Sequence, residues 1–519
     1  MLLLSLVVFL GIFLRAYHFH DWLRFGGDQS RDAAIISDAL KNKNPLPFLG
    51  PNAGNTNFLL GPMYYYFSFI SEKIFGNNPV AMAYPSLIFS ILAIPLLFLF
   101  LKEYFNKTLS LALTVLMSVS YFLVINSRFS SNPNLMPFFL LTYFYAMLKI
   151  LNNRGKKNLL WVILIGISLG VGVQLHTTFL VIMPIVTFCV FVYLLIKKYP
   201  GIWKNLAIII IISLIFNTSQ IVSEFGSNWF NSRQFFAGFR SDSKTKGNLA
   251  MEAFYISACQ VEANAYTLSS VGDDISCRNV FRSPLSRGNG EYLYYLEMTL
   301  GVLFSVTGYF LLWRNFRKTK ELKKKNFLGL VLLFNLVTFI ILVPIAKIIF
   351  VGYFLIIFLV PFVLFGLIIE AIQIGYGKIG RRIAVGMIFV LLSFSLIRDF
   401  TAAISYRDGL QDDAKNSTLG EVELMAQYVL ATRGNSSSLF FSGETRIGPR
   451  FYLPVKYFLN QANIDAKFIK AINLDNSSQH SPLYYIENNN GKIIPGQAVK
   501  GHEIISGRQF SRQAILILK

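Results

Sequence analysis

Charged side chains are scarce in this sequence. They make up 14% of its 519 residues, whereas hydrophobic residues make up 54%. A soluble protein carries about a quarter charged residues. Together with a positive mean hydropathy of +0.50, this composition excludes a soluble globular protein and predicts one that crosses a membrane many times.

Cysteine is also scarce, with three residues in the chain. Three are too few for a small domain held together by disulfides. Cys189 falls in an apolar segment and is expected to be a small buried residue. Cys259 and Cys277 fall in a segment expected on the outer face, where thiols can oxidise, and the sequence leaves open whether they pair.

Two kinds of motif are missing as well. The chain has no Walker loop and no cysteine or histidine pairs at the spacing of a zinc site. Most nucleotide-driven chemistry is thereby excluded. No cofactor is predicted, and a divalent metal is left open.

Long apolar segments run through most of the chain. A helix needs about 20 apolar residues to span a bilayer, and about eleven segments meet that length, within a range of about 10 to 13. We therefore expect a mainly α-helical, polytopic transmembrane protein. The segments are 1–19, 79–101, 108–126, 133–150, 158–175, 178–196, 204–222, 293–313, 326–345, 349–371 and 383–399.

The net charge of +21 has a topological explanation. Lysine and arginine gather in short loops between alternate apolar segments, and these loops share one side of the membrane if the amino terminus is cytoplasmic. The loops are 102–107, 149–157, 197–204, 314–325 and 378–382. We therefore predict a multi-pass protein of the cytoplasmic membrane with its amino terminus inside, embedded in the lipid bilayer and without a nucleic-acid partner.

This orientation places the longer connections outside. The outer face receives loops at about residues 20–78 and 223–291, together with residues 401–519, whereas the inner face receives only short loops. We therefore expect residues 1–400 to form the transmembrane domain and any chemistry to occur on its outer side.

Residues 401–519 differ in character from the rest of the chain. Short apolar runs at Ser438–Phe441 and Ala514–Leu518 alternate with helical patterns at Leu419–Thr432 and Val455–Ala462. Strands and helices that alternate in this way predict a small α/β domain, here on the extracytoplasmic side.

Asp28, Arg31 and Asp32 follow the first apolar segment directly. Ionisable groups so near hydrocarbon are costly unless they pair or meet a ligand. If this stretch is helical, the two carboxylates share one face and Arg31 biases their ionisation, so that one of them would serve as a base. The alternative is a helix cap with a local ion pair, worth about 1 kcal/mol.

Three short outer connections each carry one basic or potentially basic side chain: Arg128, His176 and Lys347. Such groups at one membrane face would hold an anion. For His176 the alternative is a hydrogen-bonded core residue. For Lys347 the alternative is a side chain that extends to the membrane interface.

Several motifs resemble one known family. They are Gly61-Pro62-Met63-Tyr64-Tyr65-Tyr66 after the Asp28 motif, Ser127-Arg128 with Asn132-Pro133-Asn134, the stretch Gly166 to Thr177, and Tyr353-Phe354-Leu355 with Pro361. Their order is similar to that in bacterial membrane glycosyltransferases of the GT-C superfamily, family 39, which includes protein mannosyltransferases and the aminoarabinose transferases of lipid A. The resemblance covers about the first 200 residues well, the later helices loosely and the tail hardly at all.

The resemblance implies a GT-C fold and an activity. A sugar would pass from a polyprenyl-phosphate-linked donor to a lipid, glycan or protein acceptor at the outer face, with Asp28 as general base beside Arg31 and Asp32. Phosphate leaves as a stable anion, so the reaction needs no general acid, and attack by the acceptor hydroxyl inverts the anomeric carbon. Many members have glutamate where this chain has Gln29, and no acid lies in the Arg128 loop, so the resemblance supplies no set of metal ligands here.

Cations must then hold the donor phosphate. Arg128 is the first candidate because a guanidinium matches phosphate with two donors; Asn132 would add a further donor, and Lys347 and His176 are the other candidates. Tyr64, Tyr65 and Tyr353 are candidates for the substrate groove. The alternative for the tyrosine run is the general enrichment of tyrosine where helices meet the bilayer surface.

Two other classes of protein remain to be compared with an enzyme. A transporter or flippase of lipid-linked glycans would place ionisable residues near the centres of its spans and broken helices in matching halves, whereas this chain keeps its acids in loops. A non-catalytic scaffold whose tail binds a partner would give no reason for Asp28, Arg31 and Asp32 to lie near Arg128 across the fold, as we expect them to.

Overall fold

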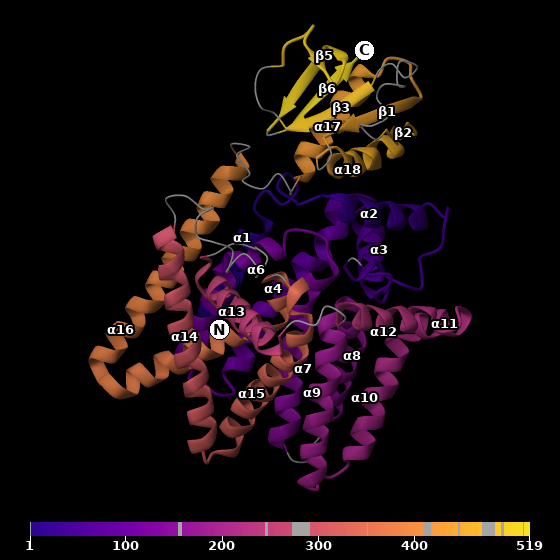
Figure 1. The fold of residues 1–519 in the computed structure, drawn as a ribbon. Helices are drawn as coiled ribbons and strands as arrows, with labels where there is room; N and C mark the ends of the chain where they lie inside the picture. Colours follow the sequence, from indigo (N-terminus) through magenta and orange to yellow (C-terminus); the bar gives the residue numbers. More distant parts are fainter. Residues whose placement is uncertain are drawn as a thin grey trace.

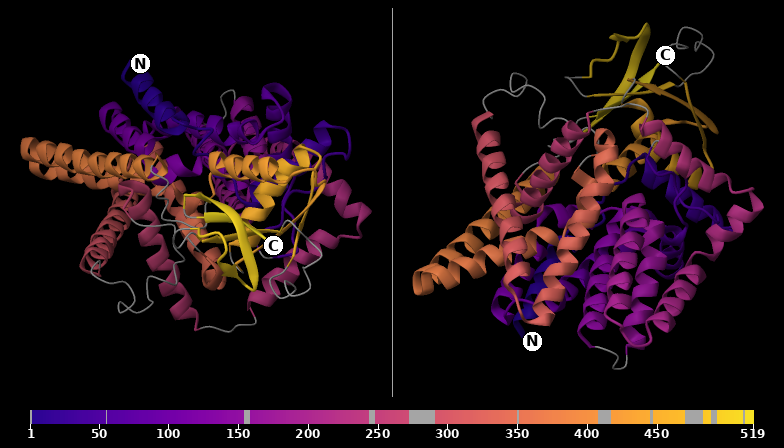
Figure 2. Two further views of the ribbon diagram at one scale, coloured as in Figure 1. Left: turned by 90° about the horizontal axis from the view of Figure 1, so that it is seen from above. Right: turned by 60° about the horizontal axis from the view of Figure 1, so that its bottom comes forward.

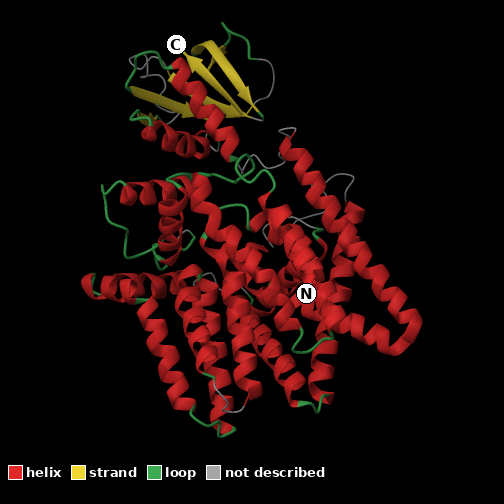
Figure 3. Cartoon of the chain, turned by 180° about the vertical axis from the view of Figure 1, so that it is seen from behind, coloured by secondary structure: helices red, strands yellow, loops and turns green. Residues whose placement is uncertain are grey.

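The computed structural model divides into a helical part and a smaller part built on a β-sheet (Figure 1). Strands are seen only in the carboxy-terminal part, which lies beyond one end of the helices (Figure 3). The structure describes residues 2–54, 56–153, 158–243, 248–271, 291–349, 351–407, 417–444, 447–469, 483–488, 493–511 and 513–519.

Long apolar helices build the membrane part. Six are long and apolar enough to span a bilayer, and the pair α10–α11, bent by 65°, makes a seventh if it counts as one span. Three shorter apolar helices, α1, α5 and α8, pack among them. The protein is therefore embedded in a membrane. The helices of this part are α1 (Leu2–Ala16), α4 (Pro79–Leu101), α5 (Lys107–Val119), α7 (Met136–Asn153), α8 (Leu159–Leu175), α9 (Thr177–Ile196), α10 (Ile202–Phe216), α11 (Thr218–Gly226), α14 (Glu291–Lys318), α15 (Leu322–Leu342) and α16 (Val360–Arg407).

The last two predicted spans have different bounds in the structure. Most of 349–371 and all of 383–399 belong to α16, whose two arms meet at Gly377 with φ 52°. Glycine adopts this left-handed conformation without a steric penalty. Residues 351–357, predicted as the start of a span, form instead the 3₁₀ helix η6 (Val351–Ile357). Figure 1 shows the turn of α16 at the lower left, and Figure 2 shows that α16 projects sideways from the bundle.

Glycines allow α8 and α10 to approach closely. A Cβ atom on Gly166 would lie 2.9 Å from the Cβ of Ile212, and one on Gly170 would lie 2.9 Å from the Cβ of Phe216. In a membrane, packing of small residues and hydrogen bonds hold helices together, because lipid tails are as apolar as the side chains. Asn217 adds such a bond, from its Nδ2 to the Gly170 carbonyl at 2.9 Å.

Both predicted outer loops contain two helices each. Residues 20–78 contain α2 (Gly27–Leu40) and α3 (Met63–Phe75), and residues 223–291 contain α12 (Phe230–Ser243) and α13 (Leu249–Ser269). Helix α13 packs against α14 and α16 rather than lying apart from the bundle. Polar residues along α13 lower its hydropathy, so the sequence did not indicate a buried helix. The side chain of Gln260 donates to the Tyr309 hydroxyl inside the bundle at 2.6 Å. Cys277 lies outside the described residues, and with it the question of whether it pairs with Cys259.

The carboxy-terminal part is the predicted α/β domain. Its sheet has the order β2-β1-β3-β6-β5-β4. Strand β1 is parallel to β2 and β3, and the remaining pairs are antiparallel. Helix α17 matches the predicted range, whereas α18 begins seven residues before Val455, at Gly448-Pro449, because proline favours the first turn of a helix. The elements are α17 (Leu419–Thr432), β1 (Ser438–Gly443), α18 (Gly448–Gln461), β2 (Asp465–Phe468), β3 (Leu483–Asn488), β4 (Ala498–Val499), β5 (His502–Phe510) and β6 (Gln513–Leu518).

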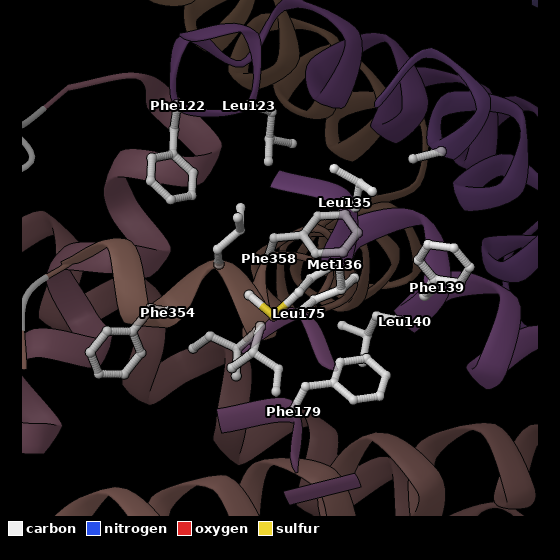
Figure 4. Packing of buried hydrophobic residues seen from close by; sticks show 14 of the residues in the cluster. Phe122, Leu123, Leu135, Met136, Phe139, Leu140, Leu175, Phe179, Phe354 and Phe358 are labelled. Carbon is white, nitrogen blue, oxygen red and sulfur yellow. The ribbon is translucent and has the colours of Figure 1, made fainter. Parts of the chain in front are cut away.

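A continuous apolar core connects the membrane helices near the ends that face the carboxy-terminal domain. Figure 4 shows part of it, including Leu135, Leu175, Phe179 and Phe354. Each of these four side chains is at most 1% exposed. They come from or adjoin η1 (Asn132–Leu135), α8, α9 and η6. Dense packing of this kind fixes the backbone of the neighbouring residues at the outer surface.

One buried acid, Glu72 on α3, predicts a pH effect on stability. Its side chain is 2% exposed, and neither carboxylate oxygen has a hydrogen-bond partner among the residues that the structure describes. Burial raises its pKa from 4.5 to about 8. The folded state therefore holds the proton more tightly than the unfolded state, and this contribution to stability is complete below pH 4.5 and lost as the pH rises through about 8.

We expect Glu72→Gln to flatten this dependence. Between about pH 6 and about pH 9, the unfolding temperature in detergent should fall more for the wild type than for the variant, because glutamine carries no proton to lose. Parallel curves for the two proteins would show that Glu72 does not titrate in this range.

Candidate active site

Helix α2 brings the Asp28 motif together as predicted. Arg31 donates from NH1 to Asp28 Oδ1 at 2.8 Å, and from Nε and NH2 to Asp32 Oδ1 at 2.9 and 2.8 Å. The helix begins after Gly26, whose backbone N–H is bound by the Gln29 side chain at 3.1 Å. Gln29, and not Asp28, therefore supplies the side-chain cap, and the two carboxylates share one arginine.

The two acids of the motif differ in their surroundings. Asp28 keeps 79% of its side chain exposed, whereas Asp32 is 4% exposed. Tyr65 donates to Asp32 Oδ1 at 2.9 Å. Burial raises the pKa of Asp32 to about 6, and Arg31 opposes that rise. Asp28 is thus accessible to a substrate, while Asp32 anchors Arg31.

A single cavity of about 460 Å³ lies against both acids. It gathers segments that are far apart in the sequence: the first outer loop, the Ser127–Asn134 loop, the connection between α8 and α9, and the segment around η6. The sequence predicted that these connections meet at one membrane face. The lining residues are Asp28, Gln29, Arg31, Asp32, Pro51, Asn52, Ala53, Gly54, Thr56, Phe58, Leu60, Ser130, Ser131, Asn132, Pro133, His176, Thr177, Thr178, Val181, Gln234, Phe235, Gly238, Ile341, Leu342, Ile345 and Tyr353.

The first candidate for the donor phosphate, Arg128, does not line this cavity. Its guanidinium is 5% exposed and donates to the backbone carbonyls of Leu14, Arg15, Tyr17 and His18 at 2.7 to 3.1 Å. These are carbonyls at and beyond the end of α1, which no helical N–H satisfies. The structure therefore does not bring Arg128 to the cavity, and its role in holding the phosphate stays a prediction. Arg128 anchors the end of α1 to the 127–134 loop.

The other two predicted cations are His176 and Lys347. His176 lines the cavity. Its Nδ1 accepts from the backbone N–H of Thr178 at 3.2 Å, so Nε2 carries the ring proton. Burial lowers its pKa to about 4, and the ring is therefore a neutral donor. Lys347 belongs to the 3₁₀ helix η5 (Val343–Ile348), but its side chain lies outside the described residues.

Asn132 lies on the cavity wall with an unused donor. The residue is 4% exposed, and its Nδ2 has no hydrogen-bond partner within the described part of the chain. Leaving a buried amide unpaired costs about 1 to 3 kcal/mol, which a ligand oxygen would recover. The predicted role of Asn132 as a donor therefore has a geometric basis.

Of the three candidate tyrosines, Tyr353 lines the cavity, where its ring meets His176 edge-on at 5.0 Å. Tyr64 and Tyr65 lie behind the wall, 0% and 2% exposed. Their hydroxyls bind Ser130 and Asp32. Both tyrosines lie on the buried face of α3, so they support residues of the cavity wall and do not form its groove.

One wall of the cavity, made by residues 51–54 and 56–60 and by α12, was not predicted from the sequence. Asn231 on α12 binds the backbone of Leu59 in both directions, at 2.8 and 2.9 Å. Gln234 and Phe235 follow on the same helix and line the cavity. No local motif marks these residues, since the contact joins positions 172 residues apart.

The carboxylates present do not form a metal site. Within the described residues, no group of three or more histidine, cysteine, aspartate or glutamate side chains is placed to share an ion. Both acids of the cavity are instead bound to Arg31. The described residues of the cavity therefore offer a metal ion no fitting set of donors.

Solved structures define the class of fold. The chain is similar to ArnT from Cupriavidus metallidurans in the apo state, with a TM-score of 0.57 at 10% identity over 99% of this chain and 97% of the other. Bound to undecaprenyl phosphate, ArnT gives a TM-score of 0.56 at 10% identity, with the same coverage. The archaeal oligosaccharyltransferase AglB from Archaeoglobus fulgidus, in complex with an inhibitory peptide and a dolichol-phosphate, gives 0.51 at 11% identity, over 94% of this chain and 69% of that one. The chain has the GT-C fold.

Sequence comparisons agree with this class. The model of the dolichyl-phosphate-mannose-protein mannosyltransferase family matches residues 60–219. A curated relative from Wigglesworthia glossinidia brevipalpis, the undecaprenyl phosphate-alpha-4-amino-4-deoxy-L-arabinose arabinosyl transferase, is 25% identical over 178 residues. That match spans 33% of this chain and 30% of the relative. The predicted resemblance to GT-C membrane glycosyltransferases is confirmed.

Proposed function

We propose that this chain transfers a sugar from a polyprenyl-phosphate-linked donor to a lipid, glycan or protein acceptor at the outer face of the cytoplasmic membrane. The observation that carries the proposal is the cavity itself, in which an exposed carboxylate, its arginine and an unpartnered amide donor meet at the end of the membrane helices. The names of the similar proteins, which include undecaprenyl phosphate and dolichol-phosphate, support this donor class.

The placement of basic loops supports the orientation. Lysines and arginines at 197–204 and 314–325 lie in the α9–α10 and α14–α15 connections, at the end of the bundle far from the carboxy-terminal domain (Figure 1). Basic loops favour the cytoplasmic side. The amino terminus is then inside, and the cavity and carboxy-terminal domain are outside.

Asp28 acts as the general base in this proposal. Its carboxylate accepts the proton of the acceptor hydroxyl while that oxygen attacks the anomeric carbon from the face opposite the phosphate. The bond between the anomeric carbon and the phosphate oxygen breaks, and its electron pair leaves with the phosphate. Because polyprenyl phosphate is a stable anion, no acid is needed, and the anomeric configuration inverts.

The departing phosphate is held by fixed donors. Asn132 offers its unpartnered Nδ2–H and His176 its Nε2–H, both on residues that line the cavity. Arg31 also lines the cavity but is paired with Asp28 and Asp32, and Lys347 stays a predicted cation for the phosphate. Preorganised donors of this kind stabilise charge that develops during the reaction, at about 3 kcal/mol each.

Release of free polyprenyl phosphate tests this proposal. Purified protein is incubated with a panel of polyprenyl-phosphate sugars and crude membrane acceptors, and the released lipid phosphate is measured. The proposal predicts release from at least one donor. Tight donor binding without release from any of them would favour the transporter or flippase instead.

Asp32 predicts the pH dependence of the reaction. Its pKa is raised to about 6, so its carboxylate is mostly ionised at pH 7 and protonated below about pH 6. Protonation removes the charge that anchors Arg31. We expect kcat to fall as the pH drops through about 6, and Asp32→Asn to remove this limb while lowering kcat at all pH values. An unchanged limb in the variant would assign it to another group.

A further inference from the structure

Three chain segments meet immediately before the catalytic helix. Leu23–Phe25 lies between residues 128–129 on one side and Ser417–Leu419 on the other. Arg24 forms a parallel bridge with Phe129 and an antiparallel bridge with Thr418. The segment 417–419 joins the carboxy-terminal domain to the rest of the chain, and we call it the strap.

Hydrogen bonds run in both directions between the strap and the segment that leads into α2. Phe25 N–H donates to the Ser417 carbonyl at 2.9 Å, and Ser417 Oγ donates to the Phe25 carbonyl at 2.7 Å. Leu419 N–H donates to the Leu23 carbonyl at 2.7 Å. Ser417 and Phe25 are 1% and 0% exposed, so water does not replace these bonds.

The carboxy-terminal domain also covers α2 along its length. In Figure 1, α18 lies across α2 on the side away from the membrane helices. The Phe25 ring meets Tyr457 at 5.6 Å and Phe458 at 5.9 Å. At the other end of α2, Gln461 donates to Ser37 Oγ at 2.9 Å and accepts a hydrogen bond from Lys41. Helix α2 is therefore clamped between α3 and the carboxy-terminal domain.

The position of Asp28 depends on this clamp. Its side chain is exposed and bound to one partner, Arg31, which belongs to the same helix. Nothing in that ion pair relates Asp28 to the opposite cavity wall. The backbone at Phe25, three residues earlier, fixes the start of the helix to the carboxy-terminal domain. Within the helix, Gln29 donates to the Ser130 carbonyl at 3.1 Å and Tyr65 donates to Asp32, so Phe25 is one of several points that hold α2. A shift of about 1 Å in a reacting group costs up to about a hundredfold in rate.

We propose that the carboxy-terminal domain is a working part of the active site, with Ser417 as a positioning residue that sets the start of α2 and thereby the placement of Asp28. This inference rests on the proposed function for its kinetic consequence.

Ser417→Ala and Ser442→Ala form a matched pair for the test. Ser442 is also a fully buried serine of the carboxy-terminal domain whose Oγ donates to a backbone carbonyl, that of Ile469 at 2.9 Å, but it does not contact α2. We expect Ser417→Ala to lower kcat about tenfold, with donor KM unchanged within about twofold, and Ser417→Thr, which keeps the hydroxyl, to restore most of the rate. Ser442→Ala should keep the wild-type kcat. Equal loss in both alanine variants, or no loss in Ser417→Ala, would overturn the proposal.

Hydrogen exchange separates this inference from the proposed function. In full-length protein, amides of Phe25 to Ser30 should exchange about tenfold faster in Ser417→Ala than in the wild type or Ser442→Ala, whether or not a sugar donor has been found. If the protein transferred no sugar but showed this change, the proposed activity would be wrong, whereas the role of Ser417 in fixing the start of α2 would stand. Unchanged exchange at these amides would refute the clamp.

Discussion

Asp28→Asn is expected to lower kcat for sugar transfer by about a hundredfold to ten-thousandfold, the range that a positioned general base contributes. Asparagine keeps the size of the side chain but accepts no proton at neutral pH. Binding of the donor should persist, because Asn132 and His176 hold their places without Asp28. The measurement is the initial rate of polyprenyl phosphate release, with donor binding measured in parallel.

Asp38→Asn supplies the control for this prediction. Asp38 lies on the same helix, ten residues further along, and outside the cavity lining. It should keep the wild-type rate. If Asp28→Asn also kept that rate, Asp28 would not be the base, and the neighbouring Asp32 would have to be tested in its place.

Arg31→Ala is expected to lower both stability and activity. Arg31 makes the ion pairs with Asp28 and Asp32 at 2.8 Å. Its loss leaves the buried Asp32 without its cation, which costs about 2 kcal/mol after allowance for the exposed side of the pair. The rate should fall by about a hundredfold, since Asp28 loses the cation that orients its carboxylate.

Arg31→Lys separates the two effects. Lysine restores a positive charge but not the planar group that contacts both acids at once. Thermal unfolding should recover most of the loss, whereas the rate should stay well below that of the wild type. If lysine restored both, charge alone would account for Arg31, and the shared geometry of the two acids would not matter.

Local patterns in the sequence predicted much of the fold and part of the site. Apolar runs indicated the membrane helices, and the four-residue spacing of Asp28 and Asp32 placed both acids on one face of α2. Motifs at the outer ends of helices also indicated which connections meet. These features depend on neighbours in sequence, where helix geometry and hydropathy decide the outcome.

The features that were not predicted from the sequence depend on contacts between residues far apart in the chain. A guanidinium can bind a phosphate or backbone carbonyls, and the packing of α1 against the 127–134 loop directs Arg128 to the carbonyls. The α13 segment was predicted as an outer loop because its amides, among them Gln260, look solvent-exposed until their partners on α14 and α15 are known. Nothing near Ser417 in sequence indicates that it binds Phe25, which lies 392 residues away.

The proposed function requires that a lipid phosphate-linked sugar reacts in the cavity beside Asp28. The most direct test is to follow one reaction with purified protein and its donor, measuring released polyprenyl phosphate, transferred sugar and the anomeric configuration of the product by NMR. We expect equal amounts of released polyprenyl phosphate and transferred sugar, and an inverted anomeric configuration. Both products should be lost in Asp28→Asn. Retained configuration, or transfer that persists in Asp28→Asn, would contradict the proposed function.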